Sequence, residues 1–150
     1  TAMDISNDAL TTAKENAFIN GFEKKIEFVQ ADVFDYLPQV ESLKPAPYDF
    51  IILDPPAFTK SRKTALDAVR GYTEINSRAM KALPRGGYLA TCSCSHFMEE
   101  KMFVKMLKNA SEYAGVSLRL IKACAQSPDH PELMSVPETK YLKFYLLQIT

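Results

Sequence analysis

The sequence predicts an α/β fold, a doubly wound and mostly parallel sheet, from three features of its 150 residues. Short apolar runs alternate with stretches of helical periodicity, which is the order of elements found in parallel sheets. Hydrophobic residues make up 47% of the chain, enough for the core of one globular domain. The run at 48–54, YDFIILD, has the continuous apolar centre of a central strand covered on both faces.

The N-terminal elements are a strand, a helix and a second strand. TAMDIS, at 1–6, resembles the end of a strand, and a helix is predicted over 6–22. Ser6 or Asn7 can cap the start of this helix, and Gly21 can stop it. Its apolar face is predicted to consist of Leu10, Ala13, Ala17 and Phe18. The alternating pattern at 25–32 predicts the second strand.

The middle of the chain continues the alternation. A short helix is expected at 33–43, entered or interrupted at Pro38, before the apolar strand at 48–54. A longer helix is predicted over 64–83, with Gly71 as a break inside it. The next strand is predicted at 86–95.

The last third contains one helix and two strands. The helix at 99–115 is predicted to end at Gly115, and its apolar face consists of Met102, Phe103, Met106, Leu107 and Ala110. Two strand candidates, 117–126 and 140–150, follow without a long helix between them. A reversed final strand at one edge of the sheet is therefore predicted.

Four predicted strands end in polar or reactive groups, and open α/β sheets bind ligands at the carboxyl ends of their strands. The groups are Asp4, Asp32, Asp54 with Pro55-Pro56, and the run 92–96. Any one carboxylate could be a helix cap, but four such ends favour a shared crevice. Asp4 is placed to accept hydrogen bonds from ribose hydroxyls, with Ile5 beside it. Asp32 is placed to accept a hydrogen bond from the amino group of an adenine, with Val33 and Phe34 flanking the ring.

The stretch LDPPAFTKSRK, at 53–63, places an acid at the root of a stiff turn, since two prolines stop both strand pairing and helix formation. Asp54 as a simple turn cap is the structural alternative. Residues 60–85 carry seven basic and two acidic side chains, which indicates either a polyanion contact or a solvated helix face. Lys60, Arg62 and Lys63 are the predicted phosphate contacts.

Composition limits the remaining options. The formal net charge is zero, which argues against a surface that is basic throughout. Three cysteines with no disulfide framework suit a reducing cytoplasm. No stretch of about 18 uninterrupted apolar residues occurs, so no membrane span is predicted. The chain starts Thr-Ala-Met-Asp, and we expect it to be a piece of a larger protein.

Together, Asp4, QADVFDYL, DFIILDPPAFTKSR, RGYTEINSRAMKAL and GGYLATCSCSHF resemble a class I S-adenosylmethionine-dependent methyltransferase. More narrowly, they resemble the cytosine-5 methyltransferases of large-subunit ribosomal RNA, through nearly the whole chain. The resemblance implies S-adenosylmethionine as cofactor, ribosomal RNA as substrate, and a missing N-terminal half. That half would carry the glycine-rich cofactor loop and a PUA-type RNA-binding module.

Cytosine-5 methylation needs a thiolate that adds to C6 and a proton donor near N3. The resemblance favours Cys94, in SCS, as the nucleophile, while Cys92 is more simply a structural residue. Asp54 suits the donor role if a dry site keeps it protonated. Asp54 and Pro55 are also predicted to contact the cofactor. Pro56 and Phe58 are predicted to contact RNA, although Phe58 is better suited to packing under the loop.

Several alternatives remain open. Cys92, Cys94 and His96 could be metal ligands, but zinc knuckles prefer a two-residue spacing, and no metal is predicted. A cysteine hydrolase using Cys94 and His96 lacks a well-oriented dyad. An amino-methyltransferase that acts on adenine or guanine would use the DPP turn and need no cysteine. The chain could also be a non-catalytic part, and its oligomeric state is open, with a homodimer among the options.

Overall fold

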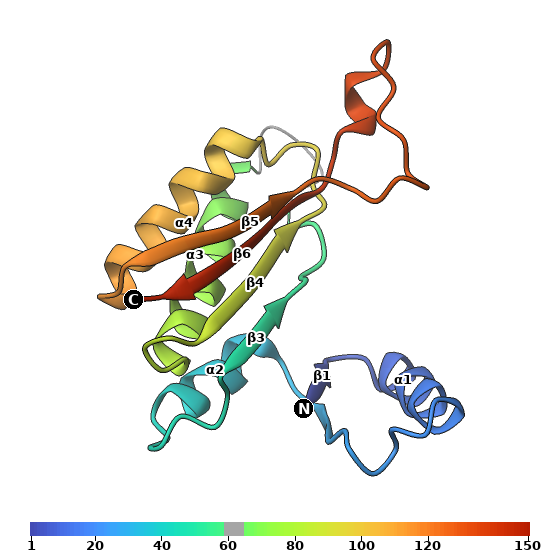
Figure 1. Ribbon diagram of the computed structural model, residues 1–150, viewed down its shortest axis with the longest axis vertical. Helices are drawn as coiled ribbons and strands as arrows, with labels where there is room; N and C mark the ends of the chain where they lie inside the picture. The colour runs from blue at the N-terminus through green and yellow to red at the C-terminus, as the bar shows by residue number, and fades with distance from the viewer. Residues whose placement is uncertain (59–64) are drawn as a thin grey trace. The chain divides into compact units, whose positions relative to one another are not determined.

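The computed structural model describes residues 1–58 and 65–150, and it divides the chain into two compact units. The first unit is Thr1–Gln39 and the second is Val40–Thr150. Figure 1 shows the elements of each unit. Helix α2, Val33–Glu41, begins in the first unit and ends in the second, with Pro38 inside it as predicted.

The first unit is a two-stranded parallel sheet with one helix between its strands. Strand β1, Ala2–Asp4, pairs with β2, Phe28–Gln30, and helix α1, Asn7–Ile19, connects them. The predicted cap is confirmed, because the Ser6 hydroxyl accepts the Ala9 amide at 3.3 Å. Gly21, just past the helix, has a φ of +70°, as a helix stop requires.

The predicted apolar face of α1 is partly wrong. Leu10 and Ala17 are buried, whereas Phe18 is 72% exposed. Helical spacing groups these residues, but burial also requires a neighbouring surface at that end of the helix.

The second unit contains a four-stranded sheet in the order β3-β4-β6-β5. The strands are β3 Phe50–Leu53, β4 Tyr88–Ser93, β5 Leu118–Cys124 and β6 Lys143–Ile149. Strands β3 and β4 are parallel, and β6 runs antiparallel to both β4 and β5. The predicted reversal of the final strand is confirmed, but its predicted edge position is wrong. Strand β6 lies inside the sheet, and β5, most of whose residues are exposed, is the edge.

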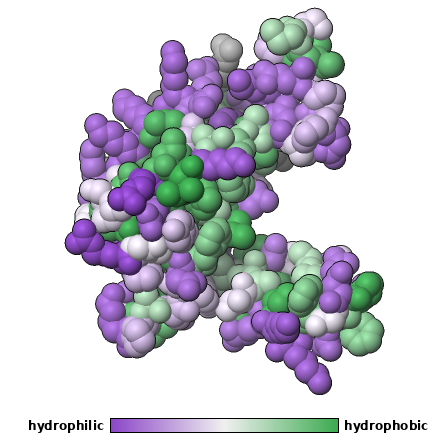
Figure 2. All heavy atoms as spheres, in the orientation of Figure 1, coloured by the Kyte–Doolittle hydropathy of each residue, from purple (hydrophilic) through white to green (hydrophobic). Residues whose placement is uncertain are grey.

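Strand β3 differs from the predicted central strand. It lies at the other edge of the four-stranded sheet, and Phe50 and Ile52 are 47% and 68% exposed. Leu53 faces the other way and is buried. Figure 2 shows hydrophobic side chains gathered over the strands of this sheet. An apolar run thus indicated a strand correctly, but not how many of its faces are covered within this chain.

Two helices pack against one face of the four-stranded sheet (Figure 1). Helix α3, Ala65–Ala82, runs without interruption through Gly71, so the predicted break is wrong. A Cβ at Gly71 would lie 3.4 Å from the Phe58 ring, which is an ordinary van der Waals contact. Helix α4, Glu100–Ala114, ends at the left-handed Gly115 as predicted, and buries Phe103, Met106, Leu107 and Ala110.

Strand directions place several chain segments at one edge of this sheet. Because β3, β4 and β5 run the same way, their carboxyl ends share this edge, where β6 begins. The connection from β5 to β6, residues 125–142, extends beyond the sheet at this edge (Figure 1). In the part of the chain that the structure describes, no helix combines the length and apolar character needed to cross a membrane.

Candidate active site

Two predicted carboxylates meet at the carboxyl end of the first unit's sheet. Asp4 ends β1 and pairs in register with Gln30 on β2. Asp32 lies two residues after Gln30. Asp4 Oδ1 accepts the Ser6 amide at 2.7 Å, and Asp32 Oδ1 accepts the Phe34 amide at 2.8 Å. Both side chains therefore make the local turn bonds expected of capping aspartates. Beside Asp4, Ile5 is 67% exposed.

A second carboxylate lies against a thiol at the carboxyl edge of the second unit. The register pairs Leu53 with Thr91, which brings the next residues on, Asp54 and Cys92, side by side. Cys92 Sγ donates to Asp54 Oδ1 at 3.1 Å and also lies 3.4 Å from the Leu53 carbonyl oxygen. The strand stops at Leu53, directly before Asp54 and the two prolines, as their chemistry predicts.

The two cysteines of the TCSCS segment have different surroundings. Cys92 is 7% exposed, whereas Cys94 lies just beyond the end of β4 and is half-buried. Burial, together with the hydrogen bond and negative charge of Asp54, raises the pKa of the Cys92 thiol to about 12. Because the thiolate is the nucleophilic form, Cys92 is a poor nucleophile near neutral pH.

Tyr72 anchors the segment between the two cysteines. The Ser93 hydroxyl donates to the Tyr72 hydroxyl at 3.0 Å, and Tyr72 is fully buried. Burial raises the pKa of Tyr72, despite the bond from Ser93. Asn76, one helical turn on, is also fully buried, and its amide donates to the Tyr72 carbonyl. The half-buried Phe58 ring packs on Tyr72 with centroids 4.6 Å apart, the contact expected of a packing residue.

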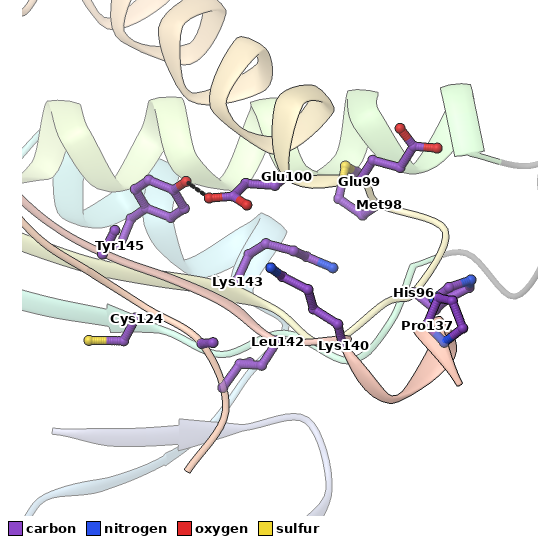
Figure 3. A pocket seen from close by; sticks show the side chains of 12 residues that line it. His96, Met98, Glu99, Glu100, Cys124, Pro137, Lys140, Leu142, Lys143 and Tyr145 are labelled. Carbon is purple, nitrogen blue, oxygen red and sulfur yellow. Dashed lines mark hydrogen bonds between the residues drawn. The ribbon is translucent and has the colours of Figure 1, made fainter. Parts of the chain in front are cut away.

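A pocket of about 380 Å³ lies at the same edge, past Cys94 (Figure 3). His96 lines it from the β4–α4 turn, and Lys140 and Lys143 line it from the chain around the start of β6. The prediction did not include Lys143, although a lysine inside the apolar run KYLKFYLLQIT is a signal that could have identified it. His130 holds the long connection, with Nδ1 3.3 Å from the Tyr141 hydroxyl.

The structure brings the predicted carboxylates and cysteines together in two groups. These two groups belong to different units. Asp4 and Asp32 share one sheet edge, and Asp54 shares another with Cys92 and Cys94. Asp54 is exposed, so residues 1–58 and 65–150 do not supply the dry setting that its donor role was expected to have. The predicted contacts Lys60, Arg62 and Lys63 lie outside the described residues. Among the described residues, no group of three or more His, Cys, Asp or Glu is arranged to hold a metal ion.

Sequence comparison identifies the family. Residues 1–143 match the family described as "Methyltransferase domain". The chain belongs to this methyltransferase family.

Relatives of this methyltransferase domain carry a more specific name. Ribosomal RNA large subunit methyltransferase I of Pseudoalteromonas atlantica is 39% identical over 150 residues, covering 99% of this chain and 38% of that protein. The protein of the same name from Klebsiella pneumoniae is 37% identical over 150 residues, covering 99% of this chain and 37% of that protein. The domain therefore spans less than two fifths of the length of these relatives.

Solved structures show the same fold. A protein from Streptococcus mutans described as a SAM-dependent methyltransferase has a TM-score of 0.81 at 18% identity, over 97% of this chain and 37% of that chain. NSun6 from Pyrococcus horikoshii, solved with SFG, has a TM-score of 0.67 at 21% identity, over 98% of this chain and 40% of that chain. The predicted methyltransferase family and the predicted α/β fold are thus confirmed.

Proposed function

We propose that the methyltransferase domain is the catalytic part of a longer enzyme that forms 5-methylcytosine in large-subunit ribosomal RNA. Its similarity to proteins named ribosomal RNA large subunit methyltransferase I supports the RNA substrate. The resemblance of its motifs to cytosine-5 enzymes supports the position of the methyl group. In this proposal the glycine-rich cofactor loop and a PUA-type RNA-binding module precede Thr1 in the complete enzyme, which acts in the cytoplasm.

The first unit fits the adenosine part of S-adenosylmethionine. Asp4 and Asp32 end or follow neighbouring parallel strands, where ribose and adenine donors can be bound by carboxylate oxygens. Oδ1 of each carboxylate is used in a turn bond, so we assign the ligand contacts to Oδ2. The exposed side chain of Ile5 and the half-buried Val33 supply apolar contacts. Asp54 and Pro55 remain predicted contacts for the methyl-bearing end.

The observation that carries the proposal is the meeting of Asp54 with the TCSCS segment at the ends of β3 and β4. S-adenosylmethionine supplies an electrophilic methyl group when bound, but C5 of cytosine is too poor a nucleophile to take it unaided. The Cys94 thiolate adds to C6, and a proton from Asp54 reaches N3, which makes C5 enamine-like. Once C5 carries the methyl group, a base removes the C5 proton and the thiolate leaves.

The surroundings of the two cysteines support Cys94 as the nucleophile. Cys92 is buried, donates to Asp54, and has a pKa raised to about 12, so its thiol stays protonated. Cys94 is more exposed and lies on the turn beyond the strand. A cytosine bound over this turn would itself cover Asp54 and exclude water from it. Pro56, with Lys60, Arg62 and Lys63, remains a predicted contact for the RNA.

The decisive experiment traps the covalent intermediate. Large-subunit ribosomal RNA transcribed with 5-fluorocytosine is incubated with the full-length enzyme and S-adenosylmethionine, then separated by denaturing electrophoresis. Fluorine at C5 cannot leave as a cation, so elimination of the thiolate is blocked and the RNA stays attached. We expect this adduct with wild-type enzyme and none with Cys94→Ala. Methylation of ordinary RNA without any adduct would refute the covalent route and favour the amino-methyltransferase.

A further inference from the structure

Lys143 is a buried lysine beside the proposed nucleophile. It is the first residue of β6 and pairs in register with Ser93, the last residue of β4 before Cys94. The residue is only 9% exposed, although lysine is rarely found inside a protein without a partner for its charge. Its position in the sheet therefore calls for an explanation.

The ammonium group is held by two backbone carbonyls. Lys143 Nζ donates to the Ser95 carbonyl at 2.5 Å and to the Tyr141 carbonyl at 2.6 Å. The first bond joins β6 to the residue after Cys94. The second hydrogen bond attaches the end of the 125–142 connection to the same ammonium group. The Cys94 turn is thus attached to β6 through one charged atom.

Burying the positive charge of Lys143 costs the folded chain free energy. Among residues 1–58 and 65–150, no carboxylate forms an ion pair with Lys143. Burial lowers the pKa of Lys143 to about 8, while the charges of Cys94 and Glu100 oppose that change. A hydrophobic side chain would fill the space at a smaller cost in free energy. A buried cation whose hydrogen bonds hold the turn of the proposed nucleophile points to a role in the chemistry.

We propose that Lys143 is a positioning residue, whose ammonium group fixes the turn that carries Cys94 through the Ser95 carbonyl. This inference rests on the proposed function, in which Cys94 attacks the base. The two hydrogen bonds of Lys143 Nζ join the residue after Cys94 and the end of the 125–142 connection to the first residue of β6. One side chain therefore fixes the geometry of the turn.

The other titratable groups around Lys143 come from each neighbouring element. Glu99 and Glu100 lie at the start of α4, His96 on the turn before it, Cys124 on β5 and Lys140 before β6. Glu100 accepts the Tyr145 hydroxyl at 2.9 Å. Figure 3 shows Lys140 and Lys143 both extending into this pocket. Lys140 is more than half exposed and makes only a long 3.9 Å ion pair with Glu132, so it serves as the matched control.

The test uses the full-length enzyme with Lys143→Met, Lys143→Arg and Lys140→Met. Single-turnover methylation of large-subunit ribosomal RNA is measured from pH 6 to 10, with thermal unfolding as a check on folding. We expect Lys143→Met to lose about tenfold in rate at pH 7, because the turn that carries Cys94 is no longer held in place, while Lys140→Met matches wild type. The wild-type rate should fall above about pH 8, as Lys143 loses its proton. Lys143→Arg keeps its charge and should move that decline to higher pH.

A second measurement does not depend on the proposed reaction. Alkylation of Cys94 by iodoacetamide is followed by peptide mass spectrometry, and should slow severalfold in Lys143→Met but not in Lys140→Met. If Lys143→Met retains the wild-type methylation rate, pH profile and Cys94 alkylation rate, the inference is wrong. If Cys94→Ala stays active while alkylation depends on Lys143, the covalent mechanism fails and the coupling of Lys143 to Cys94 stands.

Discussion

At the scale of single residues, the neighbouring strand ends give two cysteines of one motif opposite properties. Cys92 points its thiol at Asp54 and the Leu53 carbonyl, so its proton is held by two acceptors. Cys94 lies two residues further on, past the last paired residue of β4. A strand that ends between the two cysteines is thus enough to separate a structural thiol from an accessible one.

This difference predicts how Cys92 responds to pH and to alkylation. Its folded pKa of about 12 exceeds the ordinary value of 9.0, so the thiol form stabilises the folded protein. That contribution is complete below pH 9 and is lost as pH rises through about 12. At pH 8 the thiolate fraction is about a thousandfold below that of an ordinary cysteine.

Iodoacetamide at pH 8, followed by peptide mass spectrometry, should label Cys94 well before Cys92. The variant Cys92→Ala should still form the 5-fluorocytosine adduct, because Cys92 is not the attacking group. Labelling of Cys92 first, or an adduct that disappears in Cys92→Ala and persists in Cys94→Ala, would show that the roles are reversed.

At the scale of elements, local sequence patterns predicted helices and strands well and their surroundings poorly. The cap at Ser6 and the stop at Gly115 were predictable because they depend on a few neighbouring residues. The inner position of β6 and the edge position of β3 depend on which distant segments pair. Periodicity carries no information on that choice, which explains why both positions were predicted wrongly.

The same limit applies to Gly71, where a helix-breaking residue lies inside a continuous helix. Its neighbour is the Phe58 ring, which packs on Tyr72 and belongs to the segment after Asp54. The segment 13 positions earlier leaves room for a Cβ at this position, so the packing does not require glycine. From sequence alone, a glycine inside a helix and a glycine that ends one are indistinguishable.

Two glycine substitutions test these roles with opposite expected signs. In Gly71→Ala the new Cβ meets Phe58 at 3.4 Å, an ordinary contact, while the helix gains the propensity of alanine. We expect this variant to be about 0.5–1 kcal/mol more stable to urea. Gly115→Ala places a side chain at a φ of +68° and should lose roughly 1 kcal/mol. A loss of stability in Gly71→Ala would mean that Phe58 cannot accommodate one methyl group.

At the scale of the whole molecule, the predicted site residues are divided between two units that carry different parts of the proposed chemistry. The first unit holds Asp4 and Asp32, and the second holds Asp54, Cys94 and Lys143. The carboxyl-end rule led to the predictions of Asp4, Asp32, Asp54 and the run 92–96, since strand ends are visible in sequence, and the resemblance favoured Cys94 within that run. Lys143 was missed because its importance depends on the pairing of β6 with β4, which joins residues 50 positions apart.

This division predicts that cofactor binding and thiol chemistry can be separated by mutation. Asp4→Ala should weaken binding of S-adenosylhomocysteine to the full-length enzyme by about 1–3 kcal/mol, the loss expected for charge-assisted hydrogen bonds. Isothermal titration calorimetry measures this change. Asp8→Ala is the matched control, because Asp8 is also an exposed aspartate but lies in the first turn of α1.

With S-adenosylmethionine at saturating concentration, Asp4→Ala should form the 5-fluorocytosine adduct at nearly the wild-type rate. Cys94→Ala should show the reverse, with normal cofactor affinity and no adduct. The reason is that Asp4 contributes binding energy to the ground state and transition state alike, whereas Cys94 acts only in the reaction. Unchanged cofactor affinity in Asp4→Ala would remove the ribose assignment. A loss of adduct in Asp4→Ala that saturating cofactor does not restore would show that Asp4 contributes to the chemical step itself.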